Sequence, residues 1–227
     1  MKKIISIISI IVMLVTMTST FIVASDIFPD LSIQQFDEKG RAIIDKNTRE
    51  YVYEDHWASK DIVKSTKIGL IEGYREEDGT YVFKPDQSIT RAEFIKMAMV
   101  LSTNRTFDFD TIPADINHWA GKYIKVAEMQ RVLKKDQYTI AELDEPITRI
   151  EMISLLSKIQ INMKGIEQNR QGVLQYTDID KLTEEEKSLL LHAAKYELIK
   201  DMLTTTTFKP NQNLTRAEAT VAIMRIY

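Results

Sequence analysis

One five-residue pattern, present three times, constrains the fold of this chain more than any other feature of its sequence. It reads ITRAE at 89–93, ITRIE at 147–151 and LTRAE at 214–218. A threonine followed three residues later by a glutamate is typical of a capping box, in which each residue accepts a hydrogen bond from the other's backbone N–H. Each copy therefore predicts a helix that begins at its arginine. The predicted capping residues are Thr90, Glu93, Thr148, Glu151, Thr215 and Glu218.

The residues after each arginine follow the spacing of an amphipathic helix. In the first copy the apolar residues are Phe94, Met97, Ala98 and Leu101, at i, i+3, i+4 and i+7. The other two copies keep the same register. A helix of this kind buries its apolar stripe against another element.

A second segment recurs upstream of each copy. It reads HWASKDIVKSTKIGLI from His56 and HWAGKYIKVAEMQRVL from His118, and EEKSLLLHAAKYELI aligns with both from Glu185, which stands at the tryptophan position. Each unit thus reads as helix, loop and helix. One helix pair cannot bury its apolar face, whereas three packed copies can. The sequence predicts a mainly α bundle of three repeats with pseudo-threefold packing, and the repeats span 51–105, 106–165 and 172–227.

The N-terminus predicts export. After the cationic MKK, the stretch IISIISIIVMLVTMTSTFIVAS carries no charge. This predicts a secretory signal peptide over residues 1–25, cut near Ala24 or Ser25. The stretch is long enough to span a bilayer, so a retained anchor is the alternative; after cleavage no stable membrane span remains. Residues 26–50 lead into the first repeat, and their charged part, 37–50, reads as a loop or insertion.

Composition and motifs exclude several classes of protein. The formal net charge is −3 and no basic block stands out, which argues against a nucleic-acid binder. There is no cysteine to form a disulfide, a thiolate nucleophile or a cysteine metal site. The three histidines are scattered, so no metal site is expected, and His56 and His118 occupy equivalent places that indicate a shared structural task. No Gly-x-Ser-x-Gly, His-Glu-x-x-His or phosphate-loop motif occurs, and capping explains the repeated glutamates, so we expect neither catalysis nor a cofactor.

Together these motifs resemble the S-layer homology (SLH) domain family. The first unit carries Trp57, the loop GYREEDGTYVFKP at 73–85 and the T-R-A-E motif. The second carries Trp119 and T-R-I-E but lacks the glycine loop. The third keeps YTD at 176–178, FKP at 208–210 and T-R-A-E. The resemblance covers essentially the whole mature chain.

The resemblance implies a three-pronged bundle with the T-R-A-E helices at its centre and grooves between adjacent repeats. It implies a secreted, non-catalytic module that anchors to the wall of a Gram-positive-type bacterium. The implied ligand is an anionic secondary cell-wall polysaccharide, commonly pyruvylated, whose acidic group meets the T-R-A-E arginine. The candidate ligand-binding residues are Arg91, Arg149, Arg216, Trp57, Trp119, Gly73, Tyr74, Lys84 and Lys209.

Two interpretations of the arginines are open from the sequence. The first helical N–H groups are expected to remain unpaired and to point outward, so with the helix dipole and a forked guanidinium they would suit a carboxylate ligand. Alternatively, each arginine pairs with a carboxylate of the neighbouring repeat and holds the bundle together. The two tryptophans are expected in the core more readily than as sugar platforms, because each precedes an apolar helix. Lys84 and Lys209 are expected in solvated loops, with a ligand role as the alternative.

A second function is open as well. The chain shows no separate cargo domain, and its second and third loops depart from the family pattern. It could therefore serve as an envelope scaffold that binds another envelope protein and no longer binds glycan. An exposed apolar groove would favour that alternative.

Overall fold

The computed structural model describes residues 27–50, 52–103, 107–199 and 206–227, and the predicted signal peptide lies outside these ranges. The described chain is mainly α-helical, as predicted. The helices are α2 (Ser59–Lys67), α3 (Arg91–Ser102), α4 (Gly121–Met129), α5 (Ile140–Leu143), α6 (Arg149–Lys158), α7 (Glu184–Lys195) and α8 (Arg216–Met224). The strands are β1 (Ser32–Gln34), β2 (Tyr53–Asp55), β3 (Tyr74–Arg75) and β4 (Tyr81–Val82). Within the described ranges, no helix is long and apolar enough to cross a membrane.

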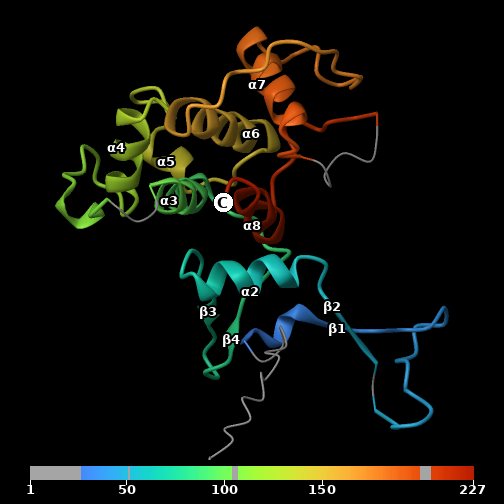
Figure 1. Ribbon diagram of the computed structural model, residues 1–227. Coiled ribbons are helices and arrows are strands. Elements are labelled where there is room, and N and C mark those ends of the chain that lie inside the picture. The colour runs from blue at the N-terminus through green and yellow to red at the C-terminus, as the bar shows by residue number, and fades with distance from the viewer. Residues whose placement is uncertain (1–26, 51, 104–106, 200–205) are drawn as a thin grey trace, which may run out of the picture.

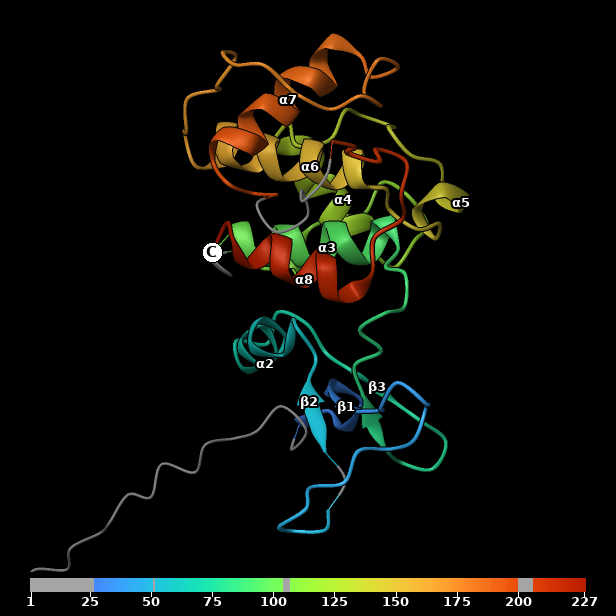
Figure 2. The same cartoon turned by 90° about the vertical axis from the view of Figure 1, so that its right-hand side faces the viewer.

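The helices that follow the repeated motif lie in the middle of the molecule. Figure 1 shows α3, α6 and α8 together, with α4, α7 and α2 outside them in three directions. Each outer helix packs on a central helix of a different unit: α4 on α3, α7 on α6 and α2 on α8. The view in Figure 2, turned by 90°, keeps the same neighbours. Each unit therefore completes its core with a helix from another unit.

Three residues that precede the capping threonines close a ring of backbone hydrogen bonds. The Ile89 N–H donates to the Leu214 carbonyl at 3.1 Å, Leu214 to Ile147 at 3.1 Å, and Ile147 to Ile89 at 3.0 Å. All three side chains are fully buried. We call these three residues the central junction. It ties together segments that lie far apart in the sequence.

The capping boxes form at all three motifs, as predicted. The glutamate carboxylate accepts the threonine N–H at 2.9 Å in α3, 2.8 Å in α6 and 2.9 Å in α8. Two further boxes, at Thr139 and Thr183, begin α5 and α7. Capping is local chemistry, and the threonine–glutamate spacing was sufficient to predict it.

The outer helices end in the same way although their sequences differ there. The second residue past each helix, Gly69, Arg131 or Glu197, adopts a left-handed φ of 61°, 57° or 56°. The next amide then bonds back five residues, as in a Schellman motif. These bonds run from Leu70 to Ser65, from Val132 to Ala127 and from Leu198 to Ala193. The shared turn persists in the second and third units without glycine.

Residues 32–55 form a β-structured arm that projects from the body (Figure 1). Strands β1 and β2 pair antiparallel at its base. Further out, Gln35, Ile43 and Val52 close a second three-way ring of backbone hydrogen bonds, each 2.9 Å long. The loop expected at 37–50 thus contains two hydrogen-bonded turns. A second small sheet, β3 with β4, forms the predicted glycine loop of the first unit.

Candidate ligand-binding site

Each repeated arginine pairs with the capping glutamate of another unit. The described contacts form a cycle around the three central helices. The pairs are Arg91–Glu151 at 2.8 Å, Arg149–Glu218 at 3.6 Å and Arg216–Glu93 at 3.7 Å. The same carboxylates therefore cap their own helices and hold the neighbouring arginines. This is the interpretation in which the arginines hold the bundle together.

The backbone amides of the arginines are also engaged. They donate to carbonyl groups that lie three residues before the next capping threonine. The bonds run from Arg91 to Glu145 at 3.0 Å, from Arg149 to Gln212 at 2.9 Å and from Arg216 to Gln87 at 2.8 Å. The expectation that these N–H groups remain unpaired was therefore wrong. The N-terminus of each helix faces backbone carbonyl groups of another unit. These carbonyls accept the hydrogen bonds that an anion would otherwise accept.

Arg216 is the most deeply engaged of the three arginines, with its side chain 4% exposed. Its Nη1 donates to the Tyr74 hydroxyl at 2.7 Å, Nη2 to the Glu72 carbonyl at 3.0 Å and Nε to the Phe83 carbonyl at 3.0 Å. The guanidinium also lies over the Tyr74 ring, 4.4 Å from its centroid. The Tyr74 hydroxyl in turn donates to Glu93 at 3.1 Å. Tyr74 thus links the first unit to the third.

Tyr138 has the corresponding place beside Arg91. The Arg91 guanidinium lies 5.4 Å from the centre of its ring. Burial and the Glu151 charge raise the pKa of Tyr138 to about 12. Arg91 is more exposed than the other two arginines, with 16% of its side-chain surface accessible. No pattern in the sequence marked Tyr138, because its distance from the next capping threonine differs from that of Tyr74.

Arg149 is nearly buried, with its side chain 7% exposed. Its Nη1 donates to the Phe208 carbonyl at 2.9 Å. Its buried Nε has no hydrogen-bond partner among the described residues. The third unit therefore lacks a described tyrosine equivalent to Tyr74 or Tyr138 beside this arginine.

Two aspartates fix the loops that carry the candidate lysines. Asp30 accepts the amides of Phe83 and Lys84 at 2.9 and 2.6 Å. Asp178 accepts those of Phe208 and Lys209 at 2.7 Å each. Lys84 and Lys209 both adopt a left-handed φ, of 58° and 54°. The aspartates of FPD at 28–30 and YTD at 176–178 thus hold the loops of units one and three in place, a role that the sequence did not reveal.

The candidate lysine and glycine of the first loop have identifiable local tasks. Lys84 pairs with Glu76 at 2.6 Å and lies 5.3 Å from the centre of the Tyr74 ring. A Cβ atom on Gly73 would lie 2.4 Å from a Phe28 ring carbon and 2.5 Å from the Val82 carbonyl oxygen. Gly73 is therefore required by the close packing of the loop.

Both tryptophans are exposed, so the expectation that they lie in the core was wrong. Trp57 is 60% exposed and Trp119 is 53% exposed. The histidine before each is buried, and its Nδ1 accepts an amide N–H two residues on: Ala58 to His56 at 3.2 Å and Ala120 to His118 at 3.1 Å. The shared structural task of the histidines is confirmed. They hold the turn that presents each indole to solvent.

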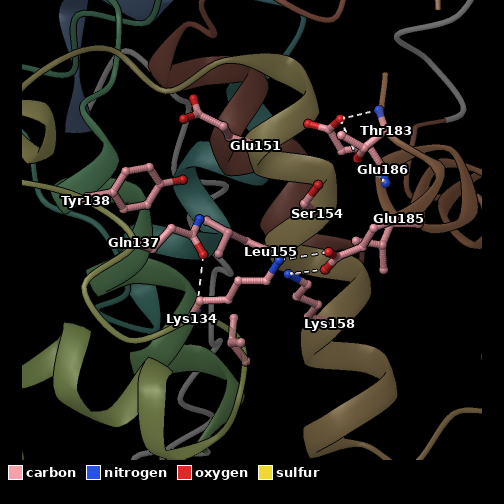
Figure 3. A pocket seen from close by; sticks show the side chains of 12 residues that line it. Lys134, Gln137, Tyr138, Glu151, Ser154, Leu155, Lys158, Thr183, Glu185 and Glu186 are labelled. Carbon is pink, nitrogen blue, oxygen red and sulfur yellow. Dashed lines mark hydrogen bonds and ion pairs between the residues drawn. The ribbon is translucent and has the colours of Figure 1, made fainter. Parts of the chain in front are cut away.

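A groove of about 350 Å³ lies where α6 meets α7 and the segment after α4. Its lining includes Lys134, Tyr138, Lys158 and Glu185. Figure 3 shows the Glu185 carboxylate facing both lysine ammonium groups, at 2.9 Å from Lys134 Nζ and 3.0 Å from Lys158 Nζ. These bonds lower the pKa of Glu185. No cluster of three or more histidine, aspartate or glutamate side chains suited to a metal ion occurs in the part of the chain that the structure describes.

Comparisons with known proteins agree with the repeated motifs. The chain matches the S-layer homology domain at residues 52–95 and 193–220. It is also similar to "Exoglucanase XynX" of Acetivibrio thermocellus, with 23% identity over 187 residues. The match covers 82% of this chain and 17% of that exoglucanase, so the chain spans only a small part of that relative's length.

Proposed function

We propose that this chain, which matches the S-layer homology domain at 52–95 and 193–220, anchors non-covalently to an anionic secondary cell-wall polysaccharide carrying pyruvate ketals. S-layer homology domains are non-catalytic modules of the bacterial cell surface that bind cell-wall polysaccharide. The predicted signal peptide and the wall of a Gram-positive-type bacterium belong to the same proposal. The exoglucanase activity in the relative's name refers to that protein.

The proposal includes three tandem repeats, 51–105, 106–165 and 172–227, packed with pseudo-threefold symmetry. The central junction supports this, because each unit contributes one equivalent residue to a closed ring. The cyclic arginine–glutamate pairs and the three identical helix ends support it independently.

One observation carries the glycan-binding proposal: the two exposed tryptophans. An indole that is more than half exposed at equivalent places in two units offers an apolar face on which a sugar ring can pack. The buried histidine beside each indole fixes the turn, so binding would sacrifice little conformational freedom. Tyr74, Lys84 and Lys209 are proposed as neighbouring polar contacts, and Gly73 as the residue that shapes the loop.

Among the arginines, we assign the ligand contact first to Arg91. Its side chain is more exposed than those of Arg149 and Arg216, at 16% against 7% and 4%. A guanidinium that already holds one carboxylate can offer its remaining N–H groups to a second. Arg149 and Arg216 remain candidates. Replacing either of these nearly buried arginines would disturb folding, so a loss of binding could not be assigned to a lost ligand contact.

Co-sedimentation of the purified protein with wall sacculi, before and after chemical removal of the secondary polysaccharide, tests the proposal. We expect binding to intact walls and its loss on stripping. The double substitution W57A/W119A should weaken binding at least about tenfold, as loss of two aromatic contacts implies. Tyr53→Ala is the matched control, because Tyr53 is 54% exposed on the arm. Equal loss in both variants, or binding that survives stripping, would overturn the glycan proposal.

A specific observation also favours the scaffold alternative. Among its described residues, the arm exposes five large apolar side chains. They are Ile33, Phe36, Ile43, Ile44 and Tyr53, between 38% and 57% exposed. Apolar side chains gathered on a projecting arm suit contact with another envelope protein. If the native chain does not bind cell walls, chemical cross-linking of the arm to another envelope protein would test this second function. Phe36→Ser is the negative variant.

A further inference from the structure

The groove between α6 and α7 differs from the other two interfaces in what occupies the tryptophan position. Glu185 aligns with Trp57 and Trp119, and α7 packs on α6 as α4 packs on α3. A carboxylate therefore stands where the other units present an indole. Other residues of this groove also differ from the residues at the aligned positions of unit one.

Two lysines face this carboxylate from different segments. Lys134 follows α4 and Lys158 ends α6, so they approach Glu185 from two sides of the groove (Figure 3). Unit one has Glu72 and Val100 at the aligned positions, and unit three has Lys200 and Arg225. What distinguishes this groove is that its two cations face a carboxylate at the tryptophan position. A carboxylate bound by two ammonium groups, one to each oxygen, has the geometry of an anion-binding site.

We propose that Glu185 is an internal competitor that occupies the anion position of this groove. A carboxylate-bearing saccharide would bind in this groove, beside Tyr138 and the Glu151 partner of Arg91, only by displacing it. This inference rests on the proposed function, because the competing ligand is the acidic glycan.

The exposure of the three side chains indicates that displacement is easy. Lys134 is 71% exposed and Glu185 is 49% exposed, whereas Lys158 is 18% exposed. Ion pairs at such exposure contribute little to folding stability. Removing the Glu185 charge should therefore free both lysines and leave the fold intact. The groove, at about 350 Å³, has room for one sugar ring.

The experiment compares Glu185→Gln with the native protein in an NMR titration with an oligosaccharide that carries one pyruvate ketal. We expect about fivefold tighter binding in the variant, with shift changes at Lys134 and Lys158. Glu184→Gln is the matched control: it removes the same charge from a residue that is 91% exposed and pairs with Lys187 at 3.0 Å. Adding Lys158→Gln to Glu185→Gln should abolish the gain.

Each outcome separates this inference from the proposed function. Equal affinities for Glu185→Gln and Glu184→Gln would overturn the competitor role even if native protein binds walls. A gain confined to Glu185→Gln would support it even if native protein does not bind walls. If the gain in affinity persists when Lys158 is also replaced, it arises from the change in net charge and not from the freed lysines. That result would also overturn the competitor role.

Discussion

Two rings of three backbone hydrogen bonds occur in the part of the molecule that the structure describes, and they lie in opposite surroundings. The central junction joins Ile89, Ile147 and Leu214 through bonds of 3.0–3.1 Å, and the arm joins Gln35, Ile43 and Val52 through bonds of 2.9 Å. The junction side chains are fully buried, whereas Ile43 is 38% exposed. Similar bond geometry thus serves a core in one place and a solvated projection in the other. The comparison indicates that the burial of the side chains, and not the length of the hydrogen bonds, sets how much each ring contributes to folding stability.

The largest expected effect comes from removing the buried charge of Arg216, two residues after the junction residue Leu214. Arg216→Ala should lower the free energy of unfolding by about 3–5 kcal/mol, because Glu93 and two backbone carbonyls would lose a buried partner. Urea denaturation measures this. Arg75→Ala, at an exposed position in β3, is the control and should change stability by less than about 0.5 kcal/mol. Similar values for the two variants would contradict the structural role of Arg216.

The two rings can be compared directly through one isoleucine in each. Ile147→Ala should reduce the free energy of unfolding by about 3 kcal/mol, since it removes a fully buried side chain. Ile43→Ala should reduce it by less than about 1 kcal/mol, because that side chain is already partly hydrated.

Thermal or urea unfolding gives both values, and hydrogen exchange of the unsubstituted protein provides an independent check. The Ile147 amide should exchange only through global opening, and the Ile43 amide through local opening of the arm. Equal exchange rates would remove the distinction between the rings.

The smallest effect at neutral pH is expected at Tyr138, next to the Arg91–Glu151 pair. Its pKa is raised to about 12 from an ordinary value of 10.0, so the folded state favours the neutral phenol. Its contribution to stability is therefore full below pH 10 and is lost as the pH rises toward 12. Tyr138→Phe should remove this alkaline loss while changing stability at pH 7 by less than about 1 kcal/mol.

Unfolding as a function of pH, with absorbance of the phenolate as a second probe, checks this prediction. Tyr53, which is 54% exposed, supplies a matched tyrosine. A pH profile unchanged by Tyr138→Phe would show that the phenol does not titrate with folding.

The sequence predicted the local features of the fold well. Threonine–glutamate spacing fixed the starts of α3, α6 and α8, and apolar periodicity fixed their buried faces. The equivalent task of His56 and His118 also followed from their places in the repeats. These features depend on residues within a few positions of one another.

The candidate site was predicted less well, because its contacts join distant segments. Asp30 clamps an amide 53 residues away, and Arg216 bonds a hydroxyl 142 residues away. Neither separation leaves a pattern in one sequence. The burial of an indole is equally undetermined, since Trp57 and Trp119 precede apolar helices and yet face solvent.

The sequence by itself thus determined three copies of one motif, the start of each central helix and the match to the S-layer homology domain at 52–95 and 193–220. Only the tertiary structure decided that the repeated arginines bond one another's capping glutamates, and that Glu185 meets two lysines in a groove. The physical reason is range. Helix capping and amphipathic periodicity act within one or two turns, whereas a salt bridge or an exposed ring depends on which units become neighbours after folding.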